Sequence, residues 1–256
     1  MNFLSLLRVE FKKIKRSKIL FILLAAAVVL WIPSIVNADI NFTMQAEGIS
    51  PENNFFIQGF MAMSWFIFPA SMVVGTVLLN QTERTNRGIL KMLALPVSTI
   101  RLCLVKFIVL LTLSAAQILM MAGMYYISAA ICSKTQDYRF VLPLSYVAKE
   151  VGLLFLSAIP MMAFFWMLAV CIQTPIFSVG IGLASIVPSV LIINTKMWFA
   201  YPSSYPFFVI TSEYGKLAAN LDTAQVERIP WIPVAVLITG ICFVISCLCF
   251  GQAERR

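Results

Sequence analysis

Residues 19–36 read ILFILLAAAVVLWIPSIV, a run of 18 residues without a charged side chain. A bilayer core about 30 Å thick needs about 20 helical residues to cross it, so this run is long enough to span a membrane. The sequence contains six such runs: Ile19–Val36, Phe56–Leu79, Leu104–Ile131, Val151–Ile172, Pro175–Ile193 and Trp231–Gly251. Only 12% of all residues are charged, against about a quarter in an average soluble domain. The sequence therefore predicts an all-α polytopic membrane protein.

The fourth and fifth runs are separated only by Gln173 and Thr174, which predicts a tight helical hairpin. One long helix is the alternative, but Pro175 lacks an amide hydrogen and disfavours helix at the residue before it. In the fifth run, small side chains recur at helical spacing: Ser178, Gly182, Ser185 and Ser189. Such a stripe predicts close helix packing, either within this protein or against a second copy.

The charged residues indicate an orientation in the membrane. If the N-terminus is cytoplasmic, the inner segments hold 13 Lys and Arg residues and the outer segments hold 6. This asymmetry follows the positive-inside rule, so we expect both termini in the cytoplasm. The formal net charge of +8 then reflects orientation rather than nucleic-acid binding. A cleaved signal peptide also begins with basic residues, but its apolar run is about 7–15 residues long, which favours an uncleaved first span.

Several residue types needed for chemistry are missing from the sequence. There is no histidine and no G-x-x-x-x-G-K-[ST] motif, which excludes histidine-based catalysis and a P-loop for ATP. Apart from Lys106 at one end of the third run, the predicted spans contain no Asp, Glu, Lys or Arg. Ion-coupled transporters usually keep such a residue in the membrane. We therefore predict no catalytic residue, no metal site and no cofactor in this chain, and expect a partner to supply the energy for transport.

The first 18 residues predict an amphipathic helix in the inner headgroup layer. Its expected apolar face consists of Leu4, Leu7, Phe11 and Ile14, with basic residues opposite. A basic flank that only sets the topology is a compatible alternative. The predicted organisation is thus an interfacial helix at 1–18, a membrane domain at 19–251 and a cytoplasmic tail at 252–256.

Residues 82–106 read TERTNRGILKMLALPVSTIRLCLVK and join a charge cluster to a short apolar helix between the second and third spans. Pro96 is expected to end that helix, and Ser98 to cap the next one. The segment resembles the first intracellular loop of ABC-type exporter permeases in its Glu83-Arg84 pair, Gly88, Leu93, the Leu95-Pro96-Val97-Ser98 sequence and Lys106. An ordinary cytoplasmic loop is the alternative reading.

In those permeases the loop forms the coupling helix, which docks into a groove of a separate ATPase subunit. The resemblance implies an ATPase-coupling role within the loop 80–103 for Glu83, Arg84, Arg87, Gly88, Lys91, Leu93 and Pro96. It also implies that ATP and Mg²⁺ bind to the partner ATPase, and that a second permease, identical or homologous, completes the membrane domain. Residues 86–89 depart from the family pattern, so the individual docking contacts stay open.

The whole chain looks most like the permeases of lantibiotic-immunity and bacitracin-resistance transporters, which protect Gram-positive bacteria from membrane-active peptides. This resemblance implies a plasma-membrane protein whose substrate is an amphipathic cationic antimicrobial peptide. A membrane scaffold that senses or sequesters the peptide without transporting it is the alternative function.

The outer segment 196–230 is rich in aromatic residues, which favour the headgroup boundary. We expect it to dip into the outer leaflet and return as a re-entrant segment. Its candidate substrate contacts are Trp198, Tyr201, Tyr205, Phe207 and Phe208, although an aromatic belt would need the same residues. Residues 201–206 resemble a motif of lantibiotic-immunity permeases. The first outer loop, residues 37–55, is acidic and could attract a cationic peptide, but the positive-inside bias alone would leave the same pattern.

Overall fold

The structure is a computed structural model that describes residues 3–44, 46–84, 98–172, 174–218 and 231–252. The α-helices in these ranges are α1 (Phe3–Arg16), α2 (Ile19–Val36), α3 (Ile40–Thr43), α4 (Pro51–Ala62), α5 (Phe68–Arg84), α7 (Thr99–Thr135), α8 (Leu144–Cys171), α9 (Pro175–Ala184), α10 (Pro188–Ile192), α11 (Tyr205–Leu217) and α12 (Trp231–Gln252). A π-helical turn, η1 (Met63–Ile67), joins α4 to α5 without a break, and two 3₁₀ turns, η2 (Trp198–Ala200) and η3 (Pro202–Ser204), precede α11. No strand occurs within the described ranges.

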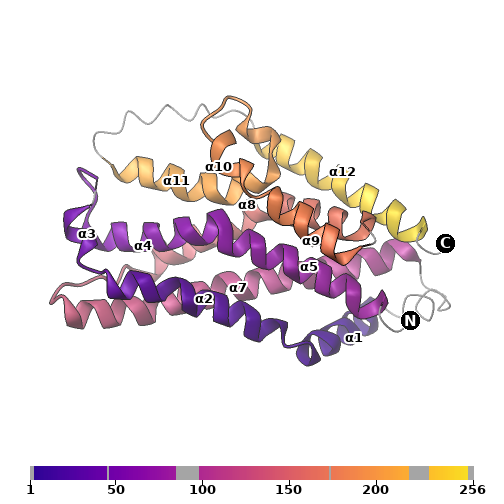
Figure 1. The fold of residues 1–256 in the computed structure, drawn as a ribbon, viewed down its shortest axis with the longest axis horizontal. Helices are drawn as coiled ribbons and strands as arrows, with labels where there is room; N and C mark the ends of the chain where they lie inside the picture. The colour runs from indigo at the N-terminus through magenta and orange to yellow at the C-terminus, as the bar shows by residue number, and fades with distance from the viewer. Residues whose placement is uncertain (1–2, 45, 85–97, 173, 219–230, 253–256) are drawn as a thin grey trace.

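Six helical segments in the described ranges are long and apolar enough to cross a bilayer, which confirms the predicted fold class. They are Ile19–Val36, Pro51–Gln81, Thr99–Thr135, Leu144–Cys171, Pro175–Ile192 and Trp231–Phe250. As an even number of spans requires, α1 and the last turn of α12 lie at the same end of the bundle (Figure 1). We call this the termini end, and the opposite end, which holds α3, the loop end. That the termini end faces the cytoplasm stays a prediction.

The helices on either side of the predicted coupling loop are longer than the apolar runs suggested. Helix α5 continues to Arg84 and α7 begins at Thr99, so both enter the predicted loop 80–103. With 37 residues, α7 is about 55 Å long and must project beyond a bilayer core. Ser98 does occupy the N-cap position, but its side chain makes no capping hydrogen bond, which corrects that part of the prediction.

The predicted hairpin between the fourth and fifth spans is confirmed. Helix α8 ends at Cys171 and α9 starts at Pro175, where a first helical position does not need the missing amide hydrogen. Helix α9 then approaches α5 closely, because a Cβ added to Gly182 would lie 2.6 Å from Cγ1 of Val73. This position of the small-residue stripe therefore serves packing within the protein.

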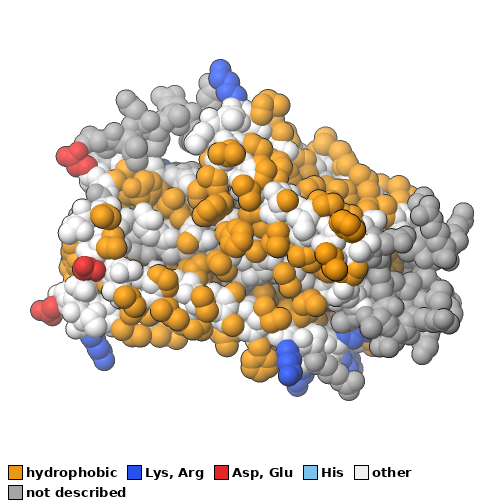
Figure 2. Space-filling model, in the orientation of Figure 1, with side chains coloured by type: hydrophobic (Ala, Val, Ile, Leu, Met, Phe, Trp, Pro, Cys, Tyr) orange, Lys and Arg blue, Asp and Glu red, His pale blue; other side chains and the backbone are white. Residues whose placement is uncertain are grey.

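The centre of the bundle is built around Trp31, whose side chain is fully buried. Its ring centroid lies 5.3 Å from that of Phe55 and 5.7 Å from that of Tyr125, and its indole N–H donates to the sulfur of Met121. Helices α4, α5, α7 and α8 supply most of the buried side chains, whereas α2, α9 and α12 expose apolar side chains outward. Figure 2 shows this apolar surface across the middle of the molecule, as expected of a protein surrounded by lipid.

The N-terminal helix forms as predicted, but a different face packs against the bundle. Leu6, Glu10 and Ile14 are buried, whereas Leu4 and Phe11 of the predicted apolar face are exposed. The reason is that α1 packs along α7, where Glu10 meets a buried lysine. The exposed apolar side chains are left free to enter a headgroup layer, as an interfacial helix requires.

Gly59 of α4 gives a test of this packing, because a Cβ added there would lie 2.4 Å from Cη2 of Trp31. The aromatic rings around Trp31 leave it no room to move, so we expect Gly59→Ala to lower the free energy of unfolding by about 1–3 kcal/mol. Gly123→Ala is the matched control, since nothing lies within 4 Å of its added Cβ. Thermal unfolding in detergent would measure both, and equal stability of the two variants would contradict this account of the core.

Candidate functional site

At the termini end, α1 is joined to α7 by a buried cluster of three charged side chains. Nζ of Lys106 lies 3.1 Å from Oε2 of Glu10, and Nζ of Lys13 lies 2.6 Å from Oε1 of the same carboxylate. Lys106 is only 1% exposed, whereas Lys13 reaches the surface. The Glu10 carboxylate therefore neutralises a lysine that has almost no access to solvent.

The charge balance of this cluster decides its stability. Burial by itself raises the pKa of Glu10, but the attraction of Lys106 and the hydrogen bond from Lys13 outweigh it, so the pKa is lowered from its ordinary value of 4.5. Removing one partner of a buried ion pair typically costs about 3–5 kcal/mol, because the other charge is left uncompensated. The pair thus holds α1 against the first turns of α7.

Two of the predicted coupling residues have their backbone described at the same end of the molecule. Glu83 and Arg84 form the last turn of α5, and their side chains lie outside the described part of the structure. The other five predicted residues, Arg87, Gly88, Lys91, Leu93 and Pro96, also lie outside the described residues. The structure does describe the helices next to them in the sequence, the end of α5 and the start of α7, and also helix α1, which the Glu10–Lys106 pair holds against α7 (Figure 1). Their role in coupling stays a prediction.

Glu10 was not among the residues singled out from the sequence. It is the only acidic residue among the first 18, which otherwise hold six Lys and Arg residues. A lone acid on a basic helix is a signal that could have identified it. Its partner, however, is 96 residues away in sequence.

The predicted substrate contacts lie in a packed aromatic cluster where α11 begins. The rings of Trp198 and Phe208 are stacked with centroids 3.8 Å apart, and Tyr205 packs between Trp198 and Trp231 of α12. Trp198 and Tyr205 are buried, and Tyr205 donates its hydroxyl hydrogen to the carbonyl of Phe199. Burial raises the pKa of Tyr205 from its ordinary value of 10 to about 12.

The remaining two predicted contacts are half-buried. Tyr201 donates its hydroxyl hydrogen to the carbonyl of Ser185, just after α9, and Phe207 lies on the first turns of α11. Helix α11 then runs along α8 and α4 toward the loop end (Figure 1). The cluster thus connects α9, α11 and α12, while its contact with a substrate and its depth in a bilayer stay predictions.

A buried carboxylate, that of Glu213, joins α11 to α8. Glu213 accepts hydrogen bonds from the hydroxyl of Tyr146, at 3.3 Å, and from Lys216, at 3.0 Å. Glu150, which is 1% exposed, forms an ion pair with Lys149 at 3.1 Å. Glu150 directly precedes the predicted fourth span, Val151–Ile172, and lies in the second turn of α8, which begins seven residues before that span. Within the described ranges, no group of three His, Cys, Asp or Glu side chains could hold a metal ion.

Comparison with known protein families identifies the group to which this architecture belongs. Residues 6–189, more than half of the chain, match the profile described as ABC-2 family transporter protein. The chain belongs to the ABC-2 transporter family. The matched region contains both Glu10 and Lys106 and the predicted coupling loop, whereas the aromatic cluster from Trp198 onward lies beyond it. No curated protein and no solved structure matches the chain.

Membership makes this protein the membrane component of an ABC transporter, a permease that works with an ABC ATPase. The six spans and the absence of a P-loop motif from its sequence agree with a division of labour in which another subunit binds ATP.

The Glu10–Lys106 pair of the permease leads to a pH-dependent prediction. Because the folded-state pKa of Glu10 is lowered, its stabilisation is present above about pH 4.5 and is lost as the pH falls through the lowered value. We expect the protection factors of the α1 amides, which correct the exchange rates for their intrinsic dependence on pH, to fall on acidification of the wild type. In Glu10→Gln, exchange should be fast already at pH 7, whereas Lys13→Gln, which keeps the Lys106 contact, should stay close to wild type. Slow exchange of the α1 amides in Glu10→Gln at pH 7 would contradict the conclusion that the Glu10–Lys106 pair holds α1 against α7.

Proposed function

We propose that this ABC-2 permease expels amphipathic cationic antimicrobial peptides, of the lantibiotic or bacitracin class, from the membrane. The family match over residues 6–189, on a bundle of six spans, is the observation that carries the transport part of this proposal. A partner ATPase binds ATP and Mg²⁺, and a second permease, identical or homologous, completes the membrane domain. The permease itself performs no covalent chemistry.

The coupling step of the proposal takes place at the termini end. The ATPase docks on the segment that links α5 to α7, with Glu83 and Arg87 among the contacts. Any displacement of that segment acts on α7, which runs almost the whole length of the bundle, and on α1, which the Glu10–Lys106 pair ties to α7. The movement of the ATPase can thus reach the loop end through one continuous helix.

The substrate part of the proposal is supported by the loop end and by the family resemblance of the sequence. Asp39 and Glu47 are exposed there, and acidic side chains stand out at that end in Figure 2. No Lys or Arg occurs between Ile19 and Glu83, so α2, α3 and α4 present acidic charge only. Lys134 and Arg139 are also exposed at the loop end, so a peptide with several positive charges would be attracted to the side formed by α2, α3 and α4, over about a Debye length, roughly 8 Å at physiological salt.

Charge reversal at the coupling loop tests the proposed function. We expect Glu83→Lys and Arg87→Glu to abolish peptide resistance in cells while the permease still folds and reaches the membrane, because the ATPase loses its docking contacts. Arg139→Glu is the matched control, since it reverses an exposed charge at the loop end and should keep resistance. Copurification of the ATPase with the tagged permease gives the direct readout.

Two results would overturn the proposal. Wild-type resistance in both Glu83→Lys and Arg87→Glu would remove the docking assignment. Protection that survives when the partner ATPase is inactivated would instead show a scaffold that sequesters the peptide without transport.

A further inference from the structure

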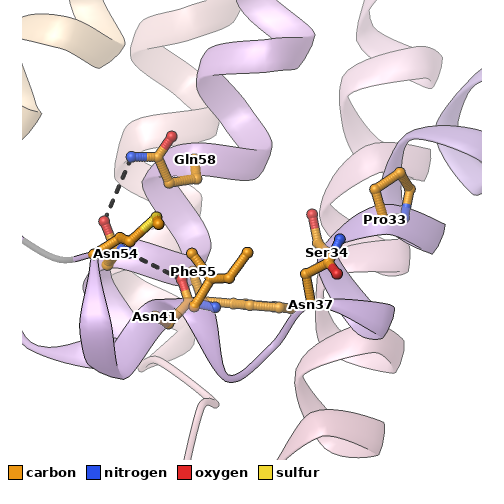
Figure 3. Close-up of a pocket in the computed structure, with 9 residues that line it drawn as sticks. Pro33, Ser34, Asn37, Asn41, Asn54, Phe55 and Gln58 are labelled. Atoms are coloured by element: carbon orange, nitrogen blue, oxygen red, sulfur yellow. Dashed lines mark hydrogen bonds between the residues drawn. The ribbon is translucent and has the colours of Figure 1, made fainter.

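A cavity of about 430 Å³ opens at the loop end between α2, α3 and α4 (Figure 3). Its volume falls in the range of about 300–1,000 Å³ that is typical of small-ligand pockets. Five of its lining residues carry uncharged side chains that can hydrogen-bond: Ser34, Asn37, Asn41, Asn54 and Gln58. The rest of the lining is apolar. We call this cavity the amide pocket.

A row of carboxamides fixes one wall of the amide pocket. Gln58 Nε2 donates to Oδ1 of Asn54 at 3.5 Å, and Asn54 Nδ2 donates to Oδ1 of Asn41 at 3.0 Å. Asn41 in turn donates to the carbonyl of Ala38 at 2.9 Å. Figure 3 shows the first two of these contacts running from α4 to α3. Because Asn41 and Asn54 are buried, the row is held in place and ends at the exposed side chain of Gln58.

Hydrogen-bonding capacity remains at the open side of the amide pocket. Oε1 of Gln58 and the side chain of Asn37 have no hydrogen-bond partner in the segments that the structure describes. Both side chains are exposed. Gln58 lies next to Gly59, the residue that packs on Trp31 in the apolar centre of the bundle. The side chains of Gln58 and Asn37 can therefore hydrogen-bond to a ligand that enters the pocket from its open side.

The chemistry of the lining selects the class of ligand. None of the lining residues is ionisable, so the pocket has no side chain that could form an ion pair with a charged group such as a lipid phosphate. A carboxamide presents one donor group and one acceptor group, and these pair edge to edge with a peptide bond. A sugar headgroup is the other ligand to consider for a pocket lined by carboxamides. The apolar face of its ring would need an accessible aromatic ring to stack on, but the ring of Phe55 is buried against Trp31 and Tyr125.

We propose that the amide pocket binds a peptide-bond-bearing segment of a cationic amphipathic peptide, through Gln58 and Asn37. The cationic side chains of that peptide would face Asp39, which is exposed between the lining residues. This inference rests on the proposed function and adds the place where the substrate is captured from the outer leaflet.

The test uses the complex of permease and ATPase in phosphatidylglycerol nanodiscs, with nisin as the probe. ATP hydrolysis is measured against nisin concentration. Gln58→Leu removes both hydrogen-bonding groups of the side chain, so we expect the half-saturating nisin concentration to rise about fivefold. Gln136→Leu, the same change in the turn after α7 and outside the pocket, is the matched control and should behave as wild type.

A second measurement does not depend on a folded Gln58 variant. A photo-crosslinking residue in place of Met44, which lines the pocket and is 75% exposed, should attach to nisin. The same residue in place of Ile22, which is exposed on α2 toward the termini end, should not. Crosslinking of nisin at position 22 but not at position 44 would contradict the proposal that nisin binds in the amide pocket.

The other outcomes separate the pocket from the proposed function. If nisin stimulates the wild type and Gln58→Leu equally, the pocket is wrong while peptide transport stands. If nisin does not stimulate the wild type at all, the peptide substrate and the pocket both fail. If adding a diglucosyl lipid to the nanodiscs, rather than nisin, gives a response that depends on Gln58, the pocket binds a sugar headgroup and the peptide proposal is overturned.

Discussion

The ion pair between Glu10 and Lys106 is the contact on which the termini end depends. Lys106 sits on a helix surrounded by apolar neighbours, and without a carboxylate its charge would be buried at a cost of several kcal/mol. Glu10 supplies that carboxylate only if α1 lies along α7 and turns the face that carries Leu6, Glu10 and Ile14 toward the bundle. The pair therefore fixes the rotation of α1, and with it which apolar side chains remain for the headgroup layer.

Different forces hold the other levels of the bundle. In the centre, Trp31 fits against Gly59 and is enclosed by aromatic rings, so packing alone sets the distance between α2 and α4. At the loop end, neutral carboxamides join α3 to α4, and the Tyr146–Glu213 hydrogen bond joins α8 to α11. Carboxamide hydrogen bonds cost little to break and remake compared with a buried ion pair. The hydrogen bonds at the loop end can therefore be replaced by hydrogen bonds to a ligand more easily than the contacts elsewhere in the bundle.

The sequence was sufficient for the number of spans and for the hairpin, because the length of an apolar run and the position of Pro175 are local properties. It misled about α1, since a helical wheel that counts only apolar residues puts Leu4 and Phe11 inward and cannot show that Glu10 has a partner on α7. The amide pocket could not be predicted either. Asn37, Asn41 and Gln58 are ordinary loop and helix residues in the sequence, and only the turn through α3 brings them to one cavity.

One element connects the two ends to which functions are assigned. From Pro51 to Arg84 the chain forms a single helical rod about 50 Å long, with Asn54 and Gln58 near one end and Glu83 in its last turn. The π-helical turn at Met63–Ile67 lies within this rod and interrupts the regular hydrogen-bond ladder. Single π-helical turns inside α-helices occur frequently at functional sites. A ligand at the amide pocket and an ATPase at the coupling loop would therefore act on the same rod, and a change in its rotation at η1 is the simplest way for each site to influence the other.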